Sequence, residues 1–260
     1  EAVVGVDAPF GYPTTLSNNG ARHAINPSVL LGLYIDPEPD GQPNIFANGD
    51  DITDTDGDDT PGTDDEDGFF DPIFDSNLVR RFISNTSKKI VCSSSNGYLN
   101  AWFDWNRDGI WNNDGEWALR DRFVFKTSCG PTIMVPTISA GSGEGISFVR
   151  YRFSRNPGLN SPTGPWGDGE VEDYPIVLLS THTLESVEDT DDAFPGDGVC
   201  ADANNKCTVR AFLLEANASP ALPSVLRIVA SGKQGALTIQ PQSPLPVVTS
   251  SIIILGDDEL

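Results

Sequence analysis

A loop rich in Asp and Asn carries the most specific chemistry in this sequence. In the segment DWNRDGIWNNDGE, residues 104–116, oxygen-bearing side chains stand at alternate positions and a glycine follows them. These residues are Asp104, Asn106, Asp108 and Gly109. The order D-x-N-x-D-G is typical of a calcium loop, in which every second residue supplies an oxygen ligand and glycine allows a sharp turn. The loop therefore predicts a calcium site.

The end of this loop departs from the EF-hand pattern. The twelfth position, where an EF-hand has its bidentate acid, is Gly115. Asp114 or Glu116 would have to bind the ion from a shifted geometry. The alternative is an Asp/Asn-rich hairpin turn that caps itself through hydrogen bonds from the backbone to its own side chains.

A second candidate for calcium is the acidic stretch at residues 36–68. No Lys or Arg occurs between Arg22 and Arg80, so the carboxylates repel one another, and such a run alone is typical of a disordered segment. Its Asp residues alternate with Gly, Pro and Asn, and Ca²⁺ takes about six to eight oxygen ligands, which would neutralise the repulsion. We expect one or more ions here. The candidate ligands are Asp50, Asp51, Asp54, Asp56, Asp58, Asp59, Asp65 and Asp67.

The overall charge limits the classes of partner. The formal net charge is −22, with 38 acidic and 16 basic residues, so nucleic acid and anionic membranes are repelled while divalent cations are attracted. No apolar run approaches the ~20 residues that span a bilayer. The chain starts at Glu1 without a signal peptide, and we expect this to be the processed N-terminus of an exported protein.

The four cysteines fall into two local pairs, Cys92 with Cys129 and Cys200 with Cys207. Neither pair has the spacing of a structural zinc site. We expect two disulfides, which suit an oxidising compartment, and free buried thiols are the alternative.

Short segments of alternating polarity, separated by Gly, Asn and Pro, dominate from Leu78 onward. They predict an antiparallel β-sandwich or barrel, with strands in LVRRFIS, YLNAWFDW, WALRDRFVF, TIMVPTI, ISFVRYRFS and VEDYPIVLL. In ISFVRYRFS, Arg150 and Arg152 share one face, and we expect at least one of them to pair with an acid. The acids of DGEVEDY (Glu170, Glu172 and Asp173) are candidates for that pairing or for metal binding. Four tryptophans flank the calcium loop, as packing residues or as a platform for sugars.

After Leu179 the pattern changes. The segment TVRAFLLEAN predicts a short helix with Thr208 as its N-cap and Pro220 as its stop. SVLRIVAS, ALTIQ and VVTSSIIIL follow and predict further strands.

Several spaced motifs resemble the GEVED domain of bacterial secreted and cell-surface proteins. They are DAPFGYPTT, NNGARHAI, the acidic DGQPN and DDEDG, LNAWFDWNRDGIWNNDGE, VRYRFS and DGEVEDY. The resemblance covers most of residues 1–179 and implies a β-sandwich module without a known catalytic role.

The remaining part, residues 180–260, resembles the CSLREA domain. The resemblance rests on PGDGVC and on CTVRA, residues 207–211. It implies that the short helix caps the first rung of a right-handed parallel β-helix, with LRIVAS and SIIILG in that rung. Either a longer chain continues the rungs or something else covers the open end.

Taken together, we expect an all-β protein: an antiparallel β-sandwich with an acidic calcium-binding segment, followed by a short helix and the first rung of a parallel β-helix. The expected function is that of a non-enzymatic, calcium-stabilised extracellular surface or structural protein, such as an adhesin segment or the subunit of a self-assembling fibre. Its partners would be Ca²⁺, surface glycans and other copies of itself joined by β-strand addition. The alternative is a carbohydrate-binding or polysaccharide-cleaving β-helix protein, an argument from fold analogy.

Overall fold

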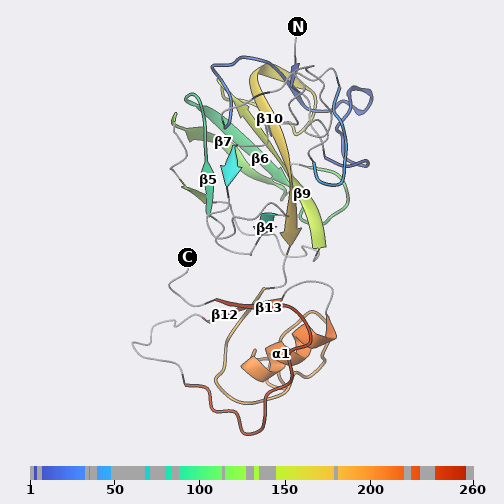
Figure 1. Ribbon diagram of the computed structural model, residues 1–260, viewed down its shortest axis with the longest axis vertical. Helices are drawn as coiled ribbons and strands as arrows, with labels where there is room; N and C mark the ends of the chain where they lie inside the picture. Colours follow the sequence, from blue (N-terminus) through green and yellow to red (C-terminus); the bar gives the residue numbers. More distant parts are fainter. Residues whose placement is uncertain are drawn as a thin grey trace, which may run out of the picture. The chain divides into compact units, whose positions relative to one another are not determined.

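The computed structural model describes residues 3–4, 8–32, 35, 40–47, 68–70, 80–82, 88–112, 115–126, 132–134, 145–178, 181–219, 224–228 and 238–255. The chain divides into two compact units, Glu1–Leu178 and Leu179–Leu260 (Figure 1). The fold is mostly β, with one short α-helix and mixed sheets. Among the described helices, none has the length and apolar character needed to cross a bilayer.

The first unit is built around a seven-stranded sheet with the order β1-β2-β10-β9-β6-β7, in which β4 also pairs with β10. Its strands are β1 (Val3–Val4), β2 (Arg22–Ala24), β4 (Arg80–Phe82), β6 (Gly97–Phe103), β7 (Trp117–Val124), β9 (Gly145–Ser154) and β10 (Pro165–Leu178). A 3₁₀ turn, η1 (Leu16–Asn18), precedes β2. Figure 1 shows β9 and β10 as the long central pair.

This sheet is mixed, whereas the sequence predicted only antiparallel pairing. β10 runs parallel to both β2 and β4, and it is antiparallel to β9. Alternating polarity specifies which face of a sheet a residue occupies, but it does not specify the direction of the neighbouring strand. The prediction of a purely antiparallel arrangement was therefore wrong.

One face of the sheet forms the main core. Val149, Tyr151 and Phe153 of β9 all lie in it, as their alternate spacing predicted. A second sheet, β3 (Phe69–Phe70), β5 (Lys88–Val91) and β8 (Thr132–Met134), contributes Phe69 and Val91 to the same core. Phe69 stacks on Tyr151 with ring centroids 3.7 Å apart. The β-sandwich itself stays a prediction.

Both arginines of β9 are fully buried on the opposite face. Arg150 forms a two-point ion pair with Asp173, at 2.8 and 2.7 Å, and its guanidinium lies 4.1 Å from the ring centroid of Trp111. The predicted pairing of an arginine with an acid is therefore present. Arg152 instead donates to backbone carbonyls, including those of Ser161 and Gly164. Burial, and then the charge of Arg150, lowers the pKa of Arg152 to about 9.

The second unit contains a small parallel sheet in the order β11 (Thr181–Thr183), β12 (Ser224–Arg227) and β13 (Ile252–Leu255). Its helix, α1 (Val209–Ala218), begins as predicted: Thr208 is the N-cap, and its hydroxyl accepts from the backbone N–H of Ala211 at 3.0 Å. The parallel pairing is compatible with a β-helix rung, which stays a prediction. The strand expected at ALTIQ is absent from its described part, residues 238–240.

A disulfide joins Cys200 and Cys207, whose Cα atoms are 5.0 Å apart. Both cysteines pack in the core of this unit with Phe212 and Leu226. Cys92 is also disulfide-bonded, and its expected partner Cys129 lies outside the described residues.

Candidate metal site

The predicted calcium loop is the connection between two adjacent antiparallel strands. Asp104 directly follows β6 and Glu116 directly precedes β7. The pairing of Trp102 with Trp117 brings the two ends of the loop together, and the backbone N–H of Phe103 donates to the carbonyl of Glu116 at 2.9 Å. A hairpin thus places residues twelve positions apart side by side.

Three carboxylates converge in this loop. One oxygen each from Asp104, Asp108 and Glu116 can be chosen so that all three lie within 4.8 Å of one another. Ca²⁺ binds oxygens at about 2.3–2.6 Å, so two ligands across the ion are separated by at most about 5 Å. The spacing of these three oxygens therefore fits a single calcium ion.

Left-handed backbone conformations shape the turn. Arg107 has φ 62° and Gly109 has φ 81°. Only Gly adopts this region without steric cost, which explains the glycine of the motif. The turn directs the carboxylate of Asp108 back toward that of Asp104.

Asp104 is completely buried and organises the turn. Its Oδ1 accepts from the N–H of Asp108 at 3.1 Å and its Oδ2 from the N–H of Gly109 at 3.0 Å. Asn106 also serves the turn, because its Oδ1 accepts from the N–H of Asp108 and its Nδ2 donates to Asp108 Oδ2. These are the bonds of the self-capping alternative, so the turn geometry alone does not distinguish it from a metal loop.

Glu116 takes part in these backbone contacts through its Oε2. It is 4% exposed, its Oε2 accepts from the N–H of Asn112 at 2.9 Å, and its Oε1 is buried without a hydrogen-bond partner. Burial raises its pKa to about 7, and the nearby charges of Asp104 and Asp108 act in the same direction. A buried, unsatisfied carboxylate oxygen beside two other acids is costly unless a proton or a cation compensates it.

One residue beside the site, Tyr12, was not predicted as part of it. The hydroxyl of Tyr12 donates to Asp104 Oδ2 at 2.5 Å, and the ring of Tyr12 lies 4.5 Å from that of Trp111. Burial, followed by the hydrogen bond to Asp104, raises the pKa of Tyr12. Nothing local in the sequence marks this contact, because 92 residues separate Tyr12 from Asp104. Three of the four tryptophans, Trp102, Trp105 and Trp111, are buried packing residues.

The other candidate ligands lie outside the described residues. They are Asp50, Asp51, Asp54, Asp56, Asp58, Asp59, Asp65, Asp67 and Asp114. Of the predicted set, the structure brings together Asp104, Asp108 and Glu116, with Asn106 beside them.

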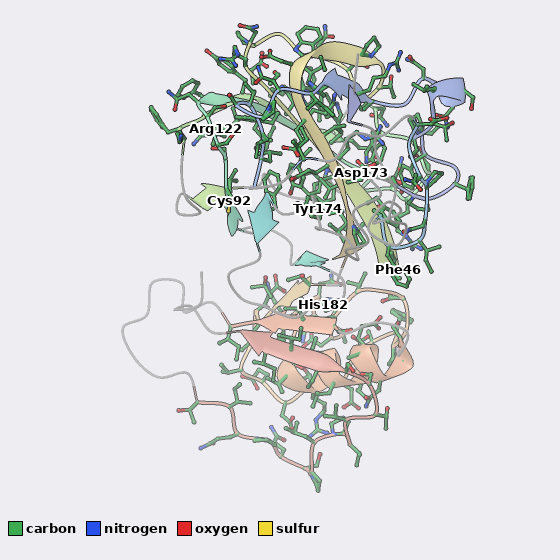
Figure 2. All side chains as sticks on the ribbon, turned by 45° about the horizontal axis from the view of Figure 1, so that its top comes forward. Phe46, Cys92, Arg122, Asp173, Tyr174 and His182 are labelled. Atoms are coloured by element: carbon green, nitrogen blue, oxygen red, sulfur yellow. A yellow bond between two sulfur atoms is a disulfide. The ribbon has the colours of Figure 1, made fainter. Side chains whose placement is uncertain are left out.

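The acids of DGEVEDY form hydrogen bonds with parts of the chain that are distant in sequence. Each accepts a backbone N–H from the N-terminal region: Leu31 donates to Glu170 Oε2, Gly68 to Glu172 Oε1 and Ala8 to Asp173 Oδ2. Figure 2 labels Asp173 and Tyr174 on β10, and the Tyr174 hydroxyl donates to Glu172 at 2.9 Å. All three acids are buried, and these contacts favour a structural role over metal binding.

Comparison with known families supports part of the first resemblance, which covered most of residues 1–179. A model described as the GEVED domain matches residues 98–177, from within β6 to within β10. Residues 98–177 form a GEVED domain. This GEVED domain contains both the carboxylate loop and the DGEVEDY motif. No CSLREA-type domain is found, so that resemblance stays a prediction. Comparisons with curated proteins and with solved structures gave no match.

Proposed function

We propose that this chain is a non-enzymatic, calcium-stabilised structural or surface protein of the bacterial cell exterior. The observation that supports this proposal best is the cluster of Asp104, Asp108 and Glu116, with its buried and unsatisfied Glu116 Oε1. Calcium at this position would neutralise three converging charges and bind Glu116 Oε1, which has no hydrogen-bond donor among the described residues.

A structural role follows from the position of the site. The ion would join the two ends of the hairpin between β6 and β7, and through the hydrogen bond from Tyr12 to Asp104 it would reach the N-terminal segment. An ion that binds only the folded state stabilises that state by mass action. The large negative charge and the disulfides suit an exported protein that meets abundant calcium.

The expected assembly belongs to the same proposal. β13 is the last strand of the order β11-β12-β13, so one of its edges has no partner strand among the described residues. A strand from another copy could pair with that edge and join subunits into a fibre. The β-sandwich of the first unit and the β-helix rung of the second are the architecture that this proposal assumes.

Terbium luminescence tests the metal site directly. Tb³⁺ replaces Ca²⁺ at oxygen sites, and Trp111 lies against Tyr12, whose hydroxyl contacts Asp104, so excitation of the indole should sensitise bound Tb³⁺. We expect emission that Ca²⁺ displaces and Mg²⁺ displaces poorly, because Mg²⁺ demands a tighter octahedral site.

The variant Asp108→Asn should abolish this emission, since Asp108 is an exposed member of the cluster. Asp197→Asn is the matched control: its carboxylate accepts a backbone N–H two residues ahead, as that of Asp108 does, but it lies in the second unit. Sensitised emission that survives in Asp108→Asn would contradict a site at this loop.

A further inference from the structure

A second feature of the first unit is an open polar cavity whose described lining residues include no acid. It has a volume of about 470 Å³ and is lined by Pro27, Ser28, Ser94, Ser95, Asn96 and Lys126. Its lining offers hydroxyls, an amide and an ammonium, in a chain that has 38 acidic residues against 16 basic ones. Ser95 Oγ is buried and has no hydrogen-bond partner. The chemistry of this cavity therefore differs from that of the metal site.

The cavity is held in shape by hydrogen bonds between three chain segments. Ser94 binds Leu30 in both directions: its N–H donates to the Leu30 carbonyl, and its hydroxyl oxygen accepts from the Leu30 N–H. The N–H of Lys126 donates to Asn96 Oδ1 at 2.7 Å. The hydroxyl of Ser93 donates to the carbonyl of Phe125 at 3.2 Å. The polar groups are thus positioned before any ligand arrives, which lowers the entropic cost of binding.

Two cations at this end of β7 have no acidic partner among the described residues. Arg122 and Lys126 are exposed, and neither forms an ion pair within the described part of the chain. Figure 2 shows Arg122 near the margin of the unit. Elsewhere the described arginines Arg150, Arg155 and Arg210 are each paired with an aspartate. Because neither Arg122 nor Lys126 has an ion-pair partner among the described residues, both are available to an external anion.

Two exposed aromatic residues lie close to Lys126 in sequence: Phe123 is in β7, and Phe125 follows the end of that strand. Phe125 is 70% exposed and Phe123 is 41% exposed. Their ring centroids are 4.9 Å apart, and Phe123 also contacts Tyr98 at 5.3 Å. Aromatic rings with apolar faces pack well against the C–H faces of pyranose rings, while the hydroxyls and the amide of the cavity suit sugar hydroxyls.

We propose that this cavity binds an acidic sugar unit of an oligosaccharide, with Lys126 at its carboxylate and Phe125 against a sugar ring. The net charge of the chain does not prevent this binding, because charges beyond about 8 Å are largely screened at physiological ionic strength, while the ammonium of Lys126 acts at contact distance. An acidic peptide fits less well, since it would use the cations but not the hydroxyl-lined cavity.

The test is calorimetric titration of the full chain with a trimer of galacturonic acid, compared with the neutral trimer of galactose. It is run without added calcium, because uronates bind calcium themselves. We expect the acidic trimer to bind at least tenfold more tightly than the neutral one. Lys126→Gln should abolish this preference, and Phe125→Ala should weaken binding of both trimers.

Lys206→Gln and Phe194→Ala are the matched controls, since both residues are exposed and lie in the second unit. They should bind as the unaltered chain does, and an unchanged melting temperature shows that each variant is folded. The proposal is overturned if the two trimers bind equally or not at all, if Lys126→Gln keeps the preference, or if a glutamate-rich peptide binds more tightly than the acidic trimer. None of these outcomes depends on the metal site.

Discussion

Replacing Glu116 by Gln should have opposite effects on stability with and without calcium. The amide keeps a carbonyl oxygen that can accept from the N–H of Asn112, as Oε2 does at 2.9 Å. Its NH₂ group then takes the position of the buried, unsatisfied Oε1, where it can donate to Asp104 or Asp108. The substitution removes a negative charge that favours the folded state only when a cation is bound. It also places a hydrogen-bond donor where Oε1 has no partner in the metal-free fold.

The pH dependence of the metal-free chain shows whether Glu116→Gln raises or lowers the stability of the fold. Folding raises the pKa of Glu116 from 4.5 to about 7, so the folded state holds this proton more tightly than the unfolded state does. Its contribution to stability is fully present below about pH 4.5 and is lost as the pH rises through about 7. Above that pH the unaltered chain carries a buried repulsive charge, and Glu116→Gln does not. Without calcium the variant should therefore melt at a higher temperature at about pH 8, and the difference should shrink at about pH 5.5.

At about pH 8, calcium should reverse the order of the two melting temperatures, so that the unaltered chain melts at a higher temperature than Glu116→Gln. An ion present at about 100 times its Kd stabilises the fold by about 2.7 kcal/mol. For a protein of roughly this size, 1 kcal/mol shifts the melting temperature by about 2–4 °C, so calcium should raise that of the unaltered chain by about 5–11 °C. Glu116→Gln should lose most of this rise at the same calcium concentration.

Differential scanning fluorimetry measures the melting temperature of each protein under four conditions, with EDTA or with calcium at each of the two pH values. Glu188→Gln is the matched control, because it neutralises an exposed glutamate in the second unit. An equal calcium-induced rise in both proteins would refute a ligand role for Glu116. A variant that is less stable than the unaltered chain in EDTA at about pH 8 would refute the view that its charge is unfavourable there.

Three further substitutions test the remainder of the fold. Arg150→Met leaves Asp173 buried without its ion-pair partner and should cost about 3–5 kcal/mol in urea unfolding; a smaller loss in the double variant with Asp173→Asn would show that the unpaired charge is the cause, and additive losses would contradict it. Thr208→Ala removes the N-cap of α1 and should cost about 1 kcal/mol, measured by thermal unfolding followed by circular dichroism, with Thr208→Ser as the control that keeps the hydroxyl. Joint replacement of Cys200 and Cys207 by Ser should cost about 2.5 kcal/mol in the chain-entropy model, and dithiothreitol should then have no further effect on the second unit.

The local features of the metal loop were predictable because they depend on neighbouring residues. The order of Asp104, Asn106, Asp108 and Gly109 specifies a turn that folds carboxylates back on themselves, and the alternation on either side specifies two strands. The need for a further acid near the end of the loop predicted Asp114 or Glu116; Glu116 lies in the cluster, and Asp114 lies outside the described residues. The N-cap at Thr208 was predictable for the same reason, since a cap and its N–H donor are three residues apart.

Contacts between distant segments were not predictable in this way. Periodicity placed Arg150 and Arg152 on one face of β9, but it could not show that this face is covered and fully buries both. The parallel pairing of β10 with β2 and β4 depends on the path of the chain between these strands. Alternating polarity does not specify that path. Tyr12 reaches Asp104 only because the N-terminal segment packs over the end of β6.

Within the first unit, some charged groups stabilise the fold and others are available to bind an external partner. The acids of DGEVEDY accept backbone N–H groups from residues 8, 31 and 68, and Asp173 also neutralises Arg150, so each of them makes a contact that holds the fold. Among the described residues, Glu116 Oε1 has no hydrogen-bond partner and the ammonium of Lys126 has no ion pair. Because a buried unsatisfied oxygen and an unpaired cation both gain from an external partner, the carboxylate loop suits a cation and the cavity beside Lys126 suits an anion. We therefore propose that the same sheet carries a calcium ion that stabilises it and a sugar that it recognises, at sites that single substitutions can separate.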